Sequence, residues 1–317
     1  NLSVSGGTGA YTYSWSNGST NQNLSNLSAG SYTVTVKDAV NCSTTKSATI
    51  TEPAALVASQ THTNVLCNGQ STGNITVTVS GGTTPYQFTW NDGANTQNRP
   101  NIAAGTYNVT VMDANNCAAN TGATITQPAA MSLSTTKTDV VCNAATTGAI
   151  DLTVSGGTGS YTYQWSNFYF TQDISGVAAG TYTVTVNDGN GCQQTNTTVI
   201  SQPSPISINV NVTNVSCYGA SNGSIGAAAS GGNGSFVYNW SNGASTWNLT
   251  GLSAGSYVLT VTDAMNCTAN LSLSVSQPSQ ILLSQTHTNV LCNGANTGAI
   301  DLSAGGGAGV YSYLWSN

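Results

Sequence analysis

The hydrophobic positions of this chain form short alternating runs that recur in the same frame along its length. In the stretch 54–128, runs of alternating apolar and polar residues are separated by turns rich in Gly and Asn. Alternation with a period of two is typical of strands with one buried face. The predicted elements are strands over 56–66 and 74–79, an aromatic strand through Trp90, a crossing segment ending at Ile102, and strands around Val109 and Ile125. No helix is expected.

The frame has a period of 75 residues, with no insertion or deletion. Five tryptophans mark it: Trp15, Trp90, Trp165, Trp240 and Trp315. A fixed period of this size indicates an array of similar units. Because Pro cannot continue a strand ladder, we expect boundaries just after the recurring EP and QP pairs. The predicted units are a partial repeat at 1–53, whole repeats at 54–128, 129–203 and 204–278, and a partial repeat at 279–317, as in an interior segment of a longer chain.

The spacing of short strands within one period indicates the fold class. Seven short strands in 75 residues, with an aromatic third strand and an apolar later one, predict a small two-sheet sandwich of the immunoglobulin kind. The chain is therefore expected to be all-β, a tandem array of such domains arranged head to tail. The five tryptophans should fill the cores. An AGTY-like corner is expected to add four core tyrosines, Tyr32, Tyr107, Tyr182 and Tyr257.

Charge is scarce and limits the kinds of partner. The 317 residues include four Lys and Arg against ten Asp and Glu, which gives a net charge of −6. Nucleic acid and anionic membrane surfaces need clustered basic side chains, so neither is expected as a partner. No apolar run approaches the length of a transmembrane helix, and direct membrane insertion is not expected. The first ten residues lack a basic and apolar leader pattern.

The sequence predicts no catalytic, cofactor or metal residues. Each unit has one aspartate in a turn, at Asp38, Asp113, Asp188 and Asp263, where Asp commonly accepts backbone N–H groups. Calcium needs six to eight oxygen ligands, and no single loop provides them. The two histidines, His62 and His287, occupy a position that holds Lys or Val in other units, which favours a solvent-facing strand position. An enzyme is not expected.

Eight cysteines, two per period and without CxxC spacing, favour disulfides in an extracellular setting. If the strands alternate in direction, the two cysteines of a unit lie at opposite ends of the sandwich, too far apart to bond. Bridges between units, Cys67 to Cys192 and Cys142 to Cys267, then follow. Cys42 and Cys117 would look upstream for partners, and Cys217 and Cys292 downstream.

Other pairings stay open at this point. If one short strand is missing, the direction of the later strands reverses and pairs within a unit become natural. These pairs are Cys67 with Cys117, Cys142 with Cys192, and Cys217 with Cys267. Free thiols, or a bond from Cys42 to Cys67 across a linker, are further alternatives.

The recurring motifs VLCNG, ITVTVSGG, YxYxWSNG, AGxYxVxVxDAxxC and ITQP resemble the SprB-type repeats of large gliding adhesins of Bacteroidetes bacteria. The resemblance covers nearly the whole chain. It implies a very long protein, secreted by the type IX system to the cell surface and moved during gliding. It implies no active site.

Two departures from the repeat mark candidate contact residues. Phe168, Tyr169 and Phe170 replace a small polar turn, and Trp247 stands where other units have Gln. Exposed aromatics can stack on sugar rings or bury into a partner surface. Packing against the neighbouring unit is the alternative for both.

The sequence therefore predicts a structural segment of an extracellular bacterial surface adhesin or filament that projects a tip and transmits force. Its expected partners are neighbouring repeats, with surface polysaccharide or identical chains as further candidates. A carbohydrate-binding repeat array and a homopolymeric fibre or sheath are the rival functions.

Overall fold

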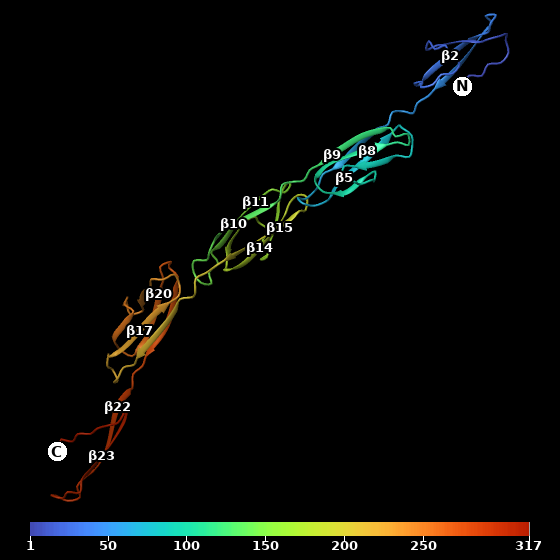
Figure 1. The fold of residues 1–317 in the computed structure, drawn as a ribbon. Coiled ribbons are helices and arrows are strands. Elements are labelled where there is room, and N and C mark those ends of the chain that lie inside the picture. The colour runs from blue at the N-terminus through green and yellow to red at the C-terminus, as the bar shows by residue number, and fades with distance from the viewer. Residues whose placement is uncertain (317) are drawn as a thin grey trace. The chain divides into compact units, whose positions relative to one another are not determined.

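The computed structural model describes residues 1–316, which form strands and turns (Figure 1). None of these residues is helical, and within them no helix is long and apolar enough to cross a membrane. The chain divides into two compact units, residues 1–130 with 156–158, and residues 131–155 with 159–317. The units are described separately below, and repeats are numbered first to fifth by the periods given above.

The N-terminal unit contains one three-stranded sheet followed by one complete sandwich. The first sheet has the order β1-β2-β3, and the sandwich consists of the sheets β4-β5-β7 and β6-β8-β9. The strands are β1 (Thr12–Trp15), β2 (Gly30–Lys37), β3 (Ser43–Ile50), β4 (Val57–Thr63), β5 (Gly73–Ser80), β6 (Gln87–Trp90), β7 (Arg99–Ile102), β8 (Gly105–Met112) and β9 (Ala118–Ile125).

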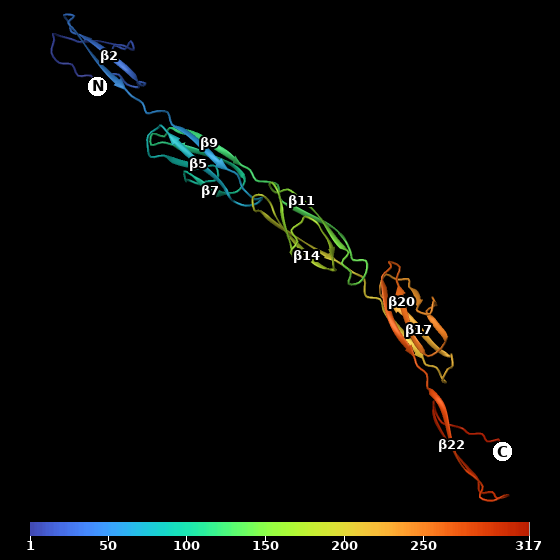
Figure 2. The ribbon, with the colours of Figure 1, turned by 180° about the vertical axis from the view of Figure 1, so that it is seen from behind.

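The C-terminal unit contains two complete sandwiches and a two-stranded sheet, β22-β23. Figures 1 and 2 show β11 and β14 on opposite sides of the third repeat. The strands of the third repeat are β10 (Ser132–Thr138), β11 (Gly148–Ser155), β12 (Thr162–Trp165), β13 (Ile174–Val177), β14 (Gly180–Asn187) and β15 (Gln193–Ile200). The remaining strands are β16 (Ser207–Thr213), β17 (Gly223–Ser230), β18 (Val237–Trp240), β19 (Asn248–Leu252), β20 (Gly255–Thr262), β21 (Thr268–Val275), β22 (Ser279–Thr288) and β23 (Ala299–Gly307).

Each complete sandwich has the strand topology of an immunoglobulin-like domain. Its first, second and fourth strands form one antiparallel sheet, and its third, fifth and sixth strands form the other. These sheets correspond to strands A-B-E and C-F-G of the immunoglobulin fold, without strand D. The chain is thus an all-β tandem array of immunoglobulin-like sandwiches. The expected count of seven strands was wrong, because a single crossing strand connects C to F.

The missing strand does not reverse the direction of the strands that follow. Gln60 Nε2 donates to Gly122 O at 3.1 Å, and Thr126 N donates to Asn64 Oδ1 at 2.9 Å, so β4 and β9 run in the same direction. Given the antiparallel pairs in each sheet, β6 and β7 also share one direction. The expectation that losing a strand would bring the two cysteines of a repeat together was therefore wrong.

Alternating apolar residues fill the space between the two sheets of each sandwich. In the second repeat, Ile75, Val77, Trp90, Val109 and Val111 are almost fully buried. Equivalent clusters surround Trp165 and Trp240. The indole N–H of each of these tryptophans donates to the carbonyl six residues later, at 2.7 to 3.0 Å. The ring is buried and its polar atom is satisfied, as a core Trp requires.

The four tyrosines of the AGTY-like corner form one recurring bond. Tyr32, Tyr107, Tyr182 and Tyr257 each donate the hydroxyl to the carbonyl four residues earlier, at 2.9 to 3.2 Å. This bond closes the corner where the chain crosses from one sheet to the other. Tyr107, Tyr182 and Tyr257 also pack at the edge of the apolar clusters.

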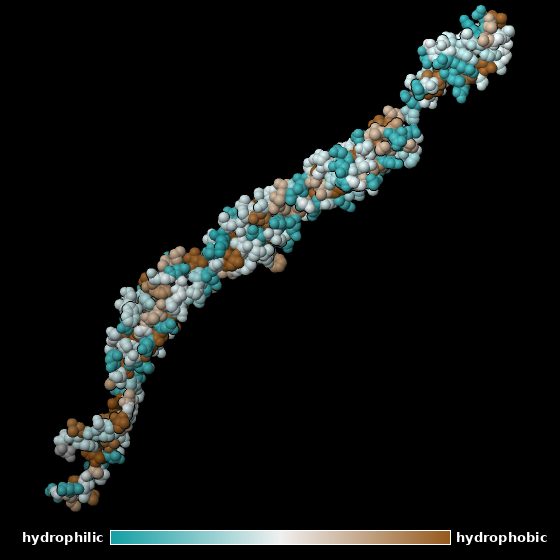
Figure 3. Space-filling view, viewed as in Figure 1, coloured by the Kyte–Doolittle hydropathy of each residue, from teal (hydrophilic) through white to brown (hydrophobic). Residues whose placement is uncertain are grey.

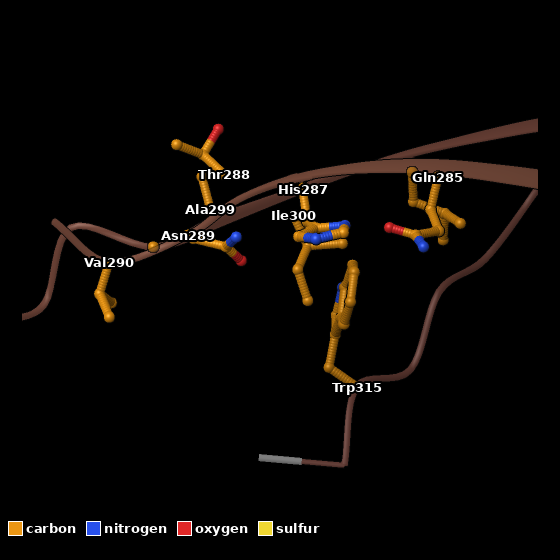
Figure 4. A pocket seen from close by; sticks show the side chains of 10 residues that line it. Gln285, His287, Thr288, Asn289, Val290, Ala299, Ile300 and Trp315 are labelled. Atoms are coloured by element: carbon orange, nitrogen blue, oxygen red, sulfur yellow. The ribbon is translucent and has the colours of Figure 1, made fainter.

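The first and fifth repeats have a sheet with no complete facing sheet among the described residues. Trp15 is accordingly half-buried, and Trp315 is 51% exposed, so the expectation that all five tryptophans lie in cores fails for these two. A hollow of about 1060 Å³ opens on the β22-β23 sheet, and Trp315 lies beside His287 and Ile300 there (Figure 4). In the complete repeats the second sheet covers this face, so the hollow is an uncovered core surface.

The tryptophans offer a test of the core. Trp165→Ala should destabilise the third repeat by about 3 to 5 kcal/mol, because it removes a fully buried ring and leaves a cavity. Trp315→Ala is the matched control, since its ring is half exposed, and it should change stability little. Urea unfolding followed by circular dichroism would measure both. Equal losses in the two variants would contradict this account of the core.

Candidate functional site

A disulfide between Cys142 and Cys267 joins the third repeat to the fourth. Its sulfur atoms are 2.02 Å apart, its Cα atoms are 5.5 Å apart, and it closes a separation of 125 residues. Cys142 lies in the turn between β10 and β11, and Cys267 precedes β21. We call the linker between these repeats and the turns that meet it, residues 141–144, 201–206, 231–233 and 263–267, the junction.

The structure excludes the pairings within a repeat. Cys142 bonds to Cys267, so neither of them is available to a cysteine of its own repeat. Cys117 and Cys217 are free and exposed, as are Cys42 and Cys292. The pair of Cys67 with Cys117 and the bond of Cys42 to Cys67 are therefore also absent. The reason is the strand direction, which places the two cysteine turns of a repeat at opposite ends of its sandwich.

Hydrogen bonds fix the linker of the junction on both sides. Asn143 Nδ2 donates to Pro203 O at 3.0 Å, and Ala144 N donates to Gln202 Oε1 at 2.8 Å. On the side of the fourth repeat, Gly232 N donates to Ser204 O at 3.0 Å. Three consecutive linker residues are thus hydrogen-bonded, and the linker cannot swivel without breaking these bonds.

One side chain bridges the two repeats next to the disulfide. Asn233 Nδ2 donates to Val141 O of the third repeat at 2.9 Å and to Asp263 Oδ2 of its own repeat at 3.0 Å. Asp263 is almost fully buried and accepts the backbone N–H groups of Met265 and Cys267, each at 2.9 Å. This carboxylate therefore holds the turn that presents Cys267 to Cys142.

Burial and hydrogen bonding shift the pKa of Asp263 in opposite directions. Burial raises the pKa of Asp263, but the N–H groups of Asn233, Cys267 and Met265 and the Asn233 amide together hold it below its ordinary value. The Thr83 N–H is the largest cause of the lowered pKa of Asp113, the equivalent residue of the second repeat. Both side chains favour their charged form in the folded protein.

This lowered pKa sets the sign of a pH dependence. A carboxylate with a lowered folded pKa adds stability that is present above its unfolded pKa of about 3.9 and is lost as the pH falls through the folded value. The melting temperature of the chain should therefore fall as the pH is lowered below about 4. Asp113→Asn and Asp263→Asn together should flatten this fall. Equal pH profiles for the variant and the original chain would contradict the role given to these turns.

The second repeat carries a charge pair in the connection between its C and E strands. Arg99 donates to Asp92 Oδ1 at 2.7 Å and to Oδ2 at 2.5 Å. The guanidinium also lies 5.4 Å from the ring centre of Trp90 and 5.6 Å from that of Tyr107. Other repeats have Leu or Ile in place of Arg99 and Asn in place of Asp92. The hydrogen bonds from Arg99 lower the pKa of Asp92 to about 2.

Replacing Arg99 should raise the pKa of Asp92. In Arg99→Leu the carboxyl of Asp92 loses both guanidinium donors, and its pKa should rise toward about 3.9. Arg99→Lys keeps the charge but not the two-pronged geometry, so it should give a value in between. An NMR titration of the Asp92 carboxyl carbon would measure all three proteins. A pKa unchanged in Arg99→Leu would contradict the assignment.

The aromatic candidates lie in the same connection of the next two repeats, outside the junction. Phe168, Tyr169 and Phe170 are 78%, 45% and 66% exposed, and Trp247 is 62% exposed. Phe168 has a φ of +64°, where three other repeats have Gly with a φ of +83° to +86°. We call residues 167–170 the aromatic turn. The high exposure of the three rings argues against packing on the fourth repeat, which belongs to the same unit.

Side chains that bind metal ions do not cluster in the described part of the chain. Residues 1–316 contain no group of three or more His, Cys, Asp or Glu side chains that could hold a metal ion. His62 is exposed, and its Nδ1 lies 3.3 Å from Gln60 Oε1. His287 is exposed on β22.

The reading of the sequence missed the polar residues that fix the linker. Asn143, Gln202 and Asn233 did not stand out, because amide side chains are abundant here. A signal was nevertheless present for the first two. The QP pair recurs with the period, as does the CN pair except at Cys217, which Tyr218 follows. The second repeat makes the same bonds, from Asn68 to Pro128 and from Gly69 to Gln127.

The chain belongs to the SprB repeat family. The family matches five segments that together span about half the residues, 1–20, 59–95, 134–168, 209–245 and 284–317. Each segment contains one of the five tryptophans that mark the period. No curated protein sequence is significantly similar to the chain. Membership of this family and a disulfide between repeats are typical of an extracellular, adhesin-like repeat segment.

Solved structures that resemble the chain are arrays of immunoglobulin and surface-layer domains. The eight N-terminal immunoglobulin domains of the Down syndrome cell adhesion molecule are 9% identical, with a TM-score of 0.28, over 93% of this chain and 60% of that one. Domains 1–6 of the surface layer protein SbsC are 14% identical, with a TM-score of 0.24, over 93% of this chain and 59% of that one. The chain thus spans about three fifths of these two proteins.

Proposed function

We propose that this chain is a structural segment of a long bacterial cell-surface adhesin, and that its repeats transmit force from a distal binding tip to the cell. The observation that supports this proposal is the Cys142–Cys267 bond across the junction. A peptide linker alone would give two neighbouring repeats a single covalent connection. The disulfide gives the junction a second covalent connection, which a load-bearing segment needs and a passive spacer does not.

The same bond protects the interior of both repeats from load. When the two ends of the C-terminal unit are pulled, force passes from Cys142 directly to Cys267 and bypasses the 124 residues between them. That bypassed stretch contains β11 to β20, which include Trp165 and Trp240. Within the two joined repeats, β10 and β21 remain in the loaded path. Unfolding under load is thus confined to a small part of the chain.

The 75-residue period extends this scheme to the whole array. Shifting the observed pair by one period gives Cys67 with Cys192, and we propose this bond as well. The free thiols of Cys42, Cys117, Cys217 and Cys292 would by the same rule find partners 125 residues away in further repeats. The repeat boundaries after Pro53, Pro128, Pro203 and Pro278 belong to the same proposal, as do transport by type IX secretion and a part in gliding.

Single-molecule stretching tests the load path. In a chain with Cys67→Ser and Cys192→Ser, held at its two ends, unfolding of the oxidised protein should release none of the length between Cys142 and Cys267. Adding a reductant, or replacing Cys142 and Cys267 by Ser as well, should release a further length of about 430 Å, because an extended residue spans about 3.5 Å.

The control for this experiment is Cys217→Ser, which removes an exposed free thiol and should leave every step unchanged. A non-reducing peptide map of the same preparation should contain one peptide that joins Cys142 to Cys267. Full release of the enclosed length without reduction would refute the force-bearing function. A peptide map with Cys142 joined to Cys192 would refute the junction itself.

A further inference from the structure

The aromatic turn of the third repeat departs from its counterparts in three costly ways. Phe168 occupies a left-handed backbone conformation that the other repeats reserve for Gly18, Gly93 and Gly243. Such a conformation is strained for a residue with a side chain. Phe168 and Phe170 then expose most of their apolar surface, which is a further cost in water.

The turn also lacks a hydrogen bond that its counterparts make. In the other three repeats, the side-chain oxygen two residues after Trp accepts a backbone N–H from two residues further on, at 3.2 to 3.3 Å. In the third repeat the equivalent atom, Asn167 Oδ1, is buried and has no partner. A buried acceptor without a donor is unfavourable. Backbone strain and an unsatisfied polar atom occurring together are typical of functional sites.

We propose that the aromatic turn binds the sugar rings of a neutral polysaccharide. The C–H face of a pyranose is apolar and slightly positive, and the face of an aromatic ring is negative, so the two stack favourably. The Tyr169 hydroxyl adds a hydrogen-bonding group beside the two Phe rings. The strands around the turn present Ser, Thr and Gln side chains, which suit sugar hydroxyls. The binding would add to the load-bearing function of the array and does not depend on it.

The size of the aromatic surface favours a sugar over a protein partner. At the observed exposures, the three rings present about 400 Å². A stable protein interface buries about 800 Å² on each partner, so this patch is too small for one. Two or three sugar rings fit an area of this size. A second copy of this chain is therefore the less suitable occupant.

Charge excludes the other polymers that stack on aromatic rings. Single-stranded nucleic acids need a basic groove beside the aromatic platform. The chain has four basic residues, and two of them, Arg99 and Lys137, are paired with Asp92 and Asp139. With a net charge of −6, an anionic polysaccharide would be repelled. A neutral glycan meets neither obstacle.

Trp247 places an exposed aromatic ring in the equivalent connection of the fourth repeat. It occupies the place of Gln22, Gln97 and Gln172, whose amides each donate to the carbonyl 20 residues earlier, at 2.6 to 2.9 Å. Trp247 cannot make that bond and is 62% exposed. Both aromatic departures thus fall in the connection between strands C and E, and each replaces a stabilising contact with an exposed ring.

Affinity electrophoresis in gels containing a soluble polysaccharide tests the proposal. The probes are three neutral glucans, hydroxyethyl cellulose, laminarin and soluble starch, with alginate as an anionic comparison. At least one neutral glucan should retard the chain, and added salt should not weaken the effect. The triple change F168G/Y169A/F170S gives the third repeat the turn sequence of the fourth. It should weaken binding about tenfold or more, because it removes three stacking rings.

The same variant separates a loss of binding from a loss of folding. Restoring Gly removes the backbone strain and allows residue 169 to donate to Asn167, so the melting temperature should rise while binding falls. The reciprocal change, G243F/A244Y/S245F in the fourth repeat, should strengthen retardation and lower the melting temperature. Both results are independent of the disulfides, so they also stand apart from the test of force transmission.

Three outcomes would overturn the proposal. The first is that none of the three neutral glucans retards the chain. The second is equal retardation of the chain and of the triple variant. The third is self-association in sedimentation velocity that depends on the aromatic turn, without glucan binding, which would assign the surface to a second copy of the chain.

Discussion

The opposite placement of the two cysteine turns in each sandwich is the constraint on which the array depends. It follows from β6 and β7 running in one direction, which leaves the turns before β5 and before β9 at different ends. A strand of eight residues is about 26 Å long, whereas bonded cysteines need Cα atoms within about 7 Å. Oxidation can therefore occur only between repeats, as Cys142 and Cys267 show. A bond of this kind also explains the constant period, because an inserted residue in either turn would move a cysteine out of reach.

The disulfide is embedded in a set of polar contacts that orient its two turns. The buried carboxylate of Asp263 shapes one turn, and the linker carbonyl of Pro203 accepts from Asn143 in the other. Glycine is required where the carboxylate approaches the chain, since a Cβ on Gly232 would lie 2.7 Å from Asp263 Oδ2. The recurring SGG motif thus supplies the glycine that this contact needs. It does not form a phosphate-binding loop, because no helix follows it. Because these atoms lie so close together, the junction accepts only residues of this size and chemistry.

The sequence predicted the interior of the sandwiches better than their connections. Alternation predicted the strands over 74–79 and around Val109 and the core position of Trp90, because burial on one face leaves a local signal. The strand count was wrong because the crossing path between sheets is decided by tertiary packing, which leaves no such signal. The cysteine pairing stayed open for the same reason, since it depends on strand direction. At the aromatic turn, Phe168 in place of Gly was visible, but the orphaned oxygen of Asn167 required coordinates.

Variation between repeats is concentrated in one connection, and the core explains how it is tolerated. Asp92, the aromatic turn and Trp247 all lie between strands C and E, and Arg99 is the first residue of strand E. In every complete repeat the connection is fastened by the buried tryptophan, whose indole N–H bonds to a backbone carbonyl six residues on. A backbone acceptor places no demand on side-chain identity, so the connection can change its residues without loosening the core. The junction has no such freedom, because its contacts use the side chains of Asn143, Gln202 and Asp263 themselves. A repeat with a fixed junction and a variable connection can therefore acquire a binding surface in one unit while every unit still joins to the next.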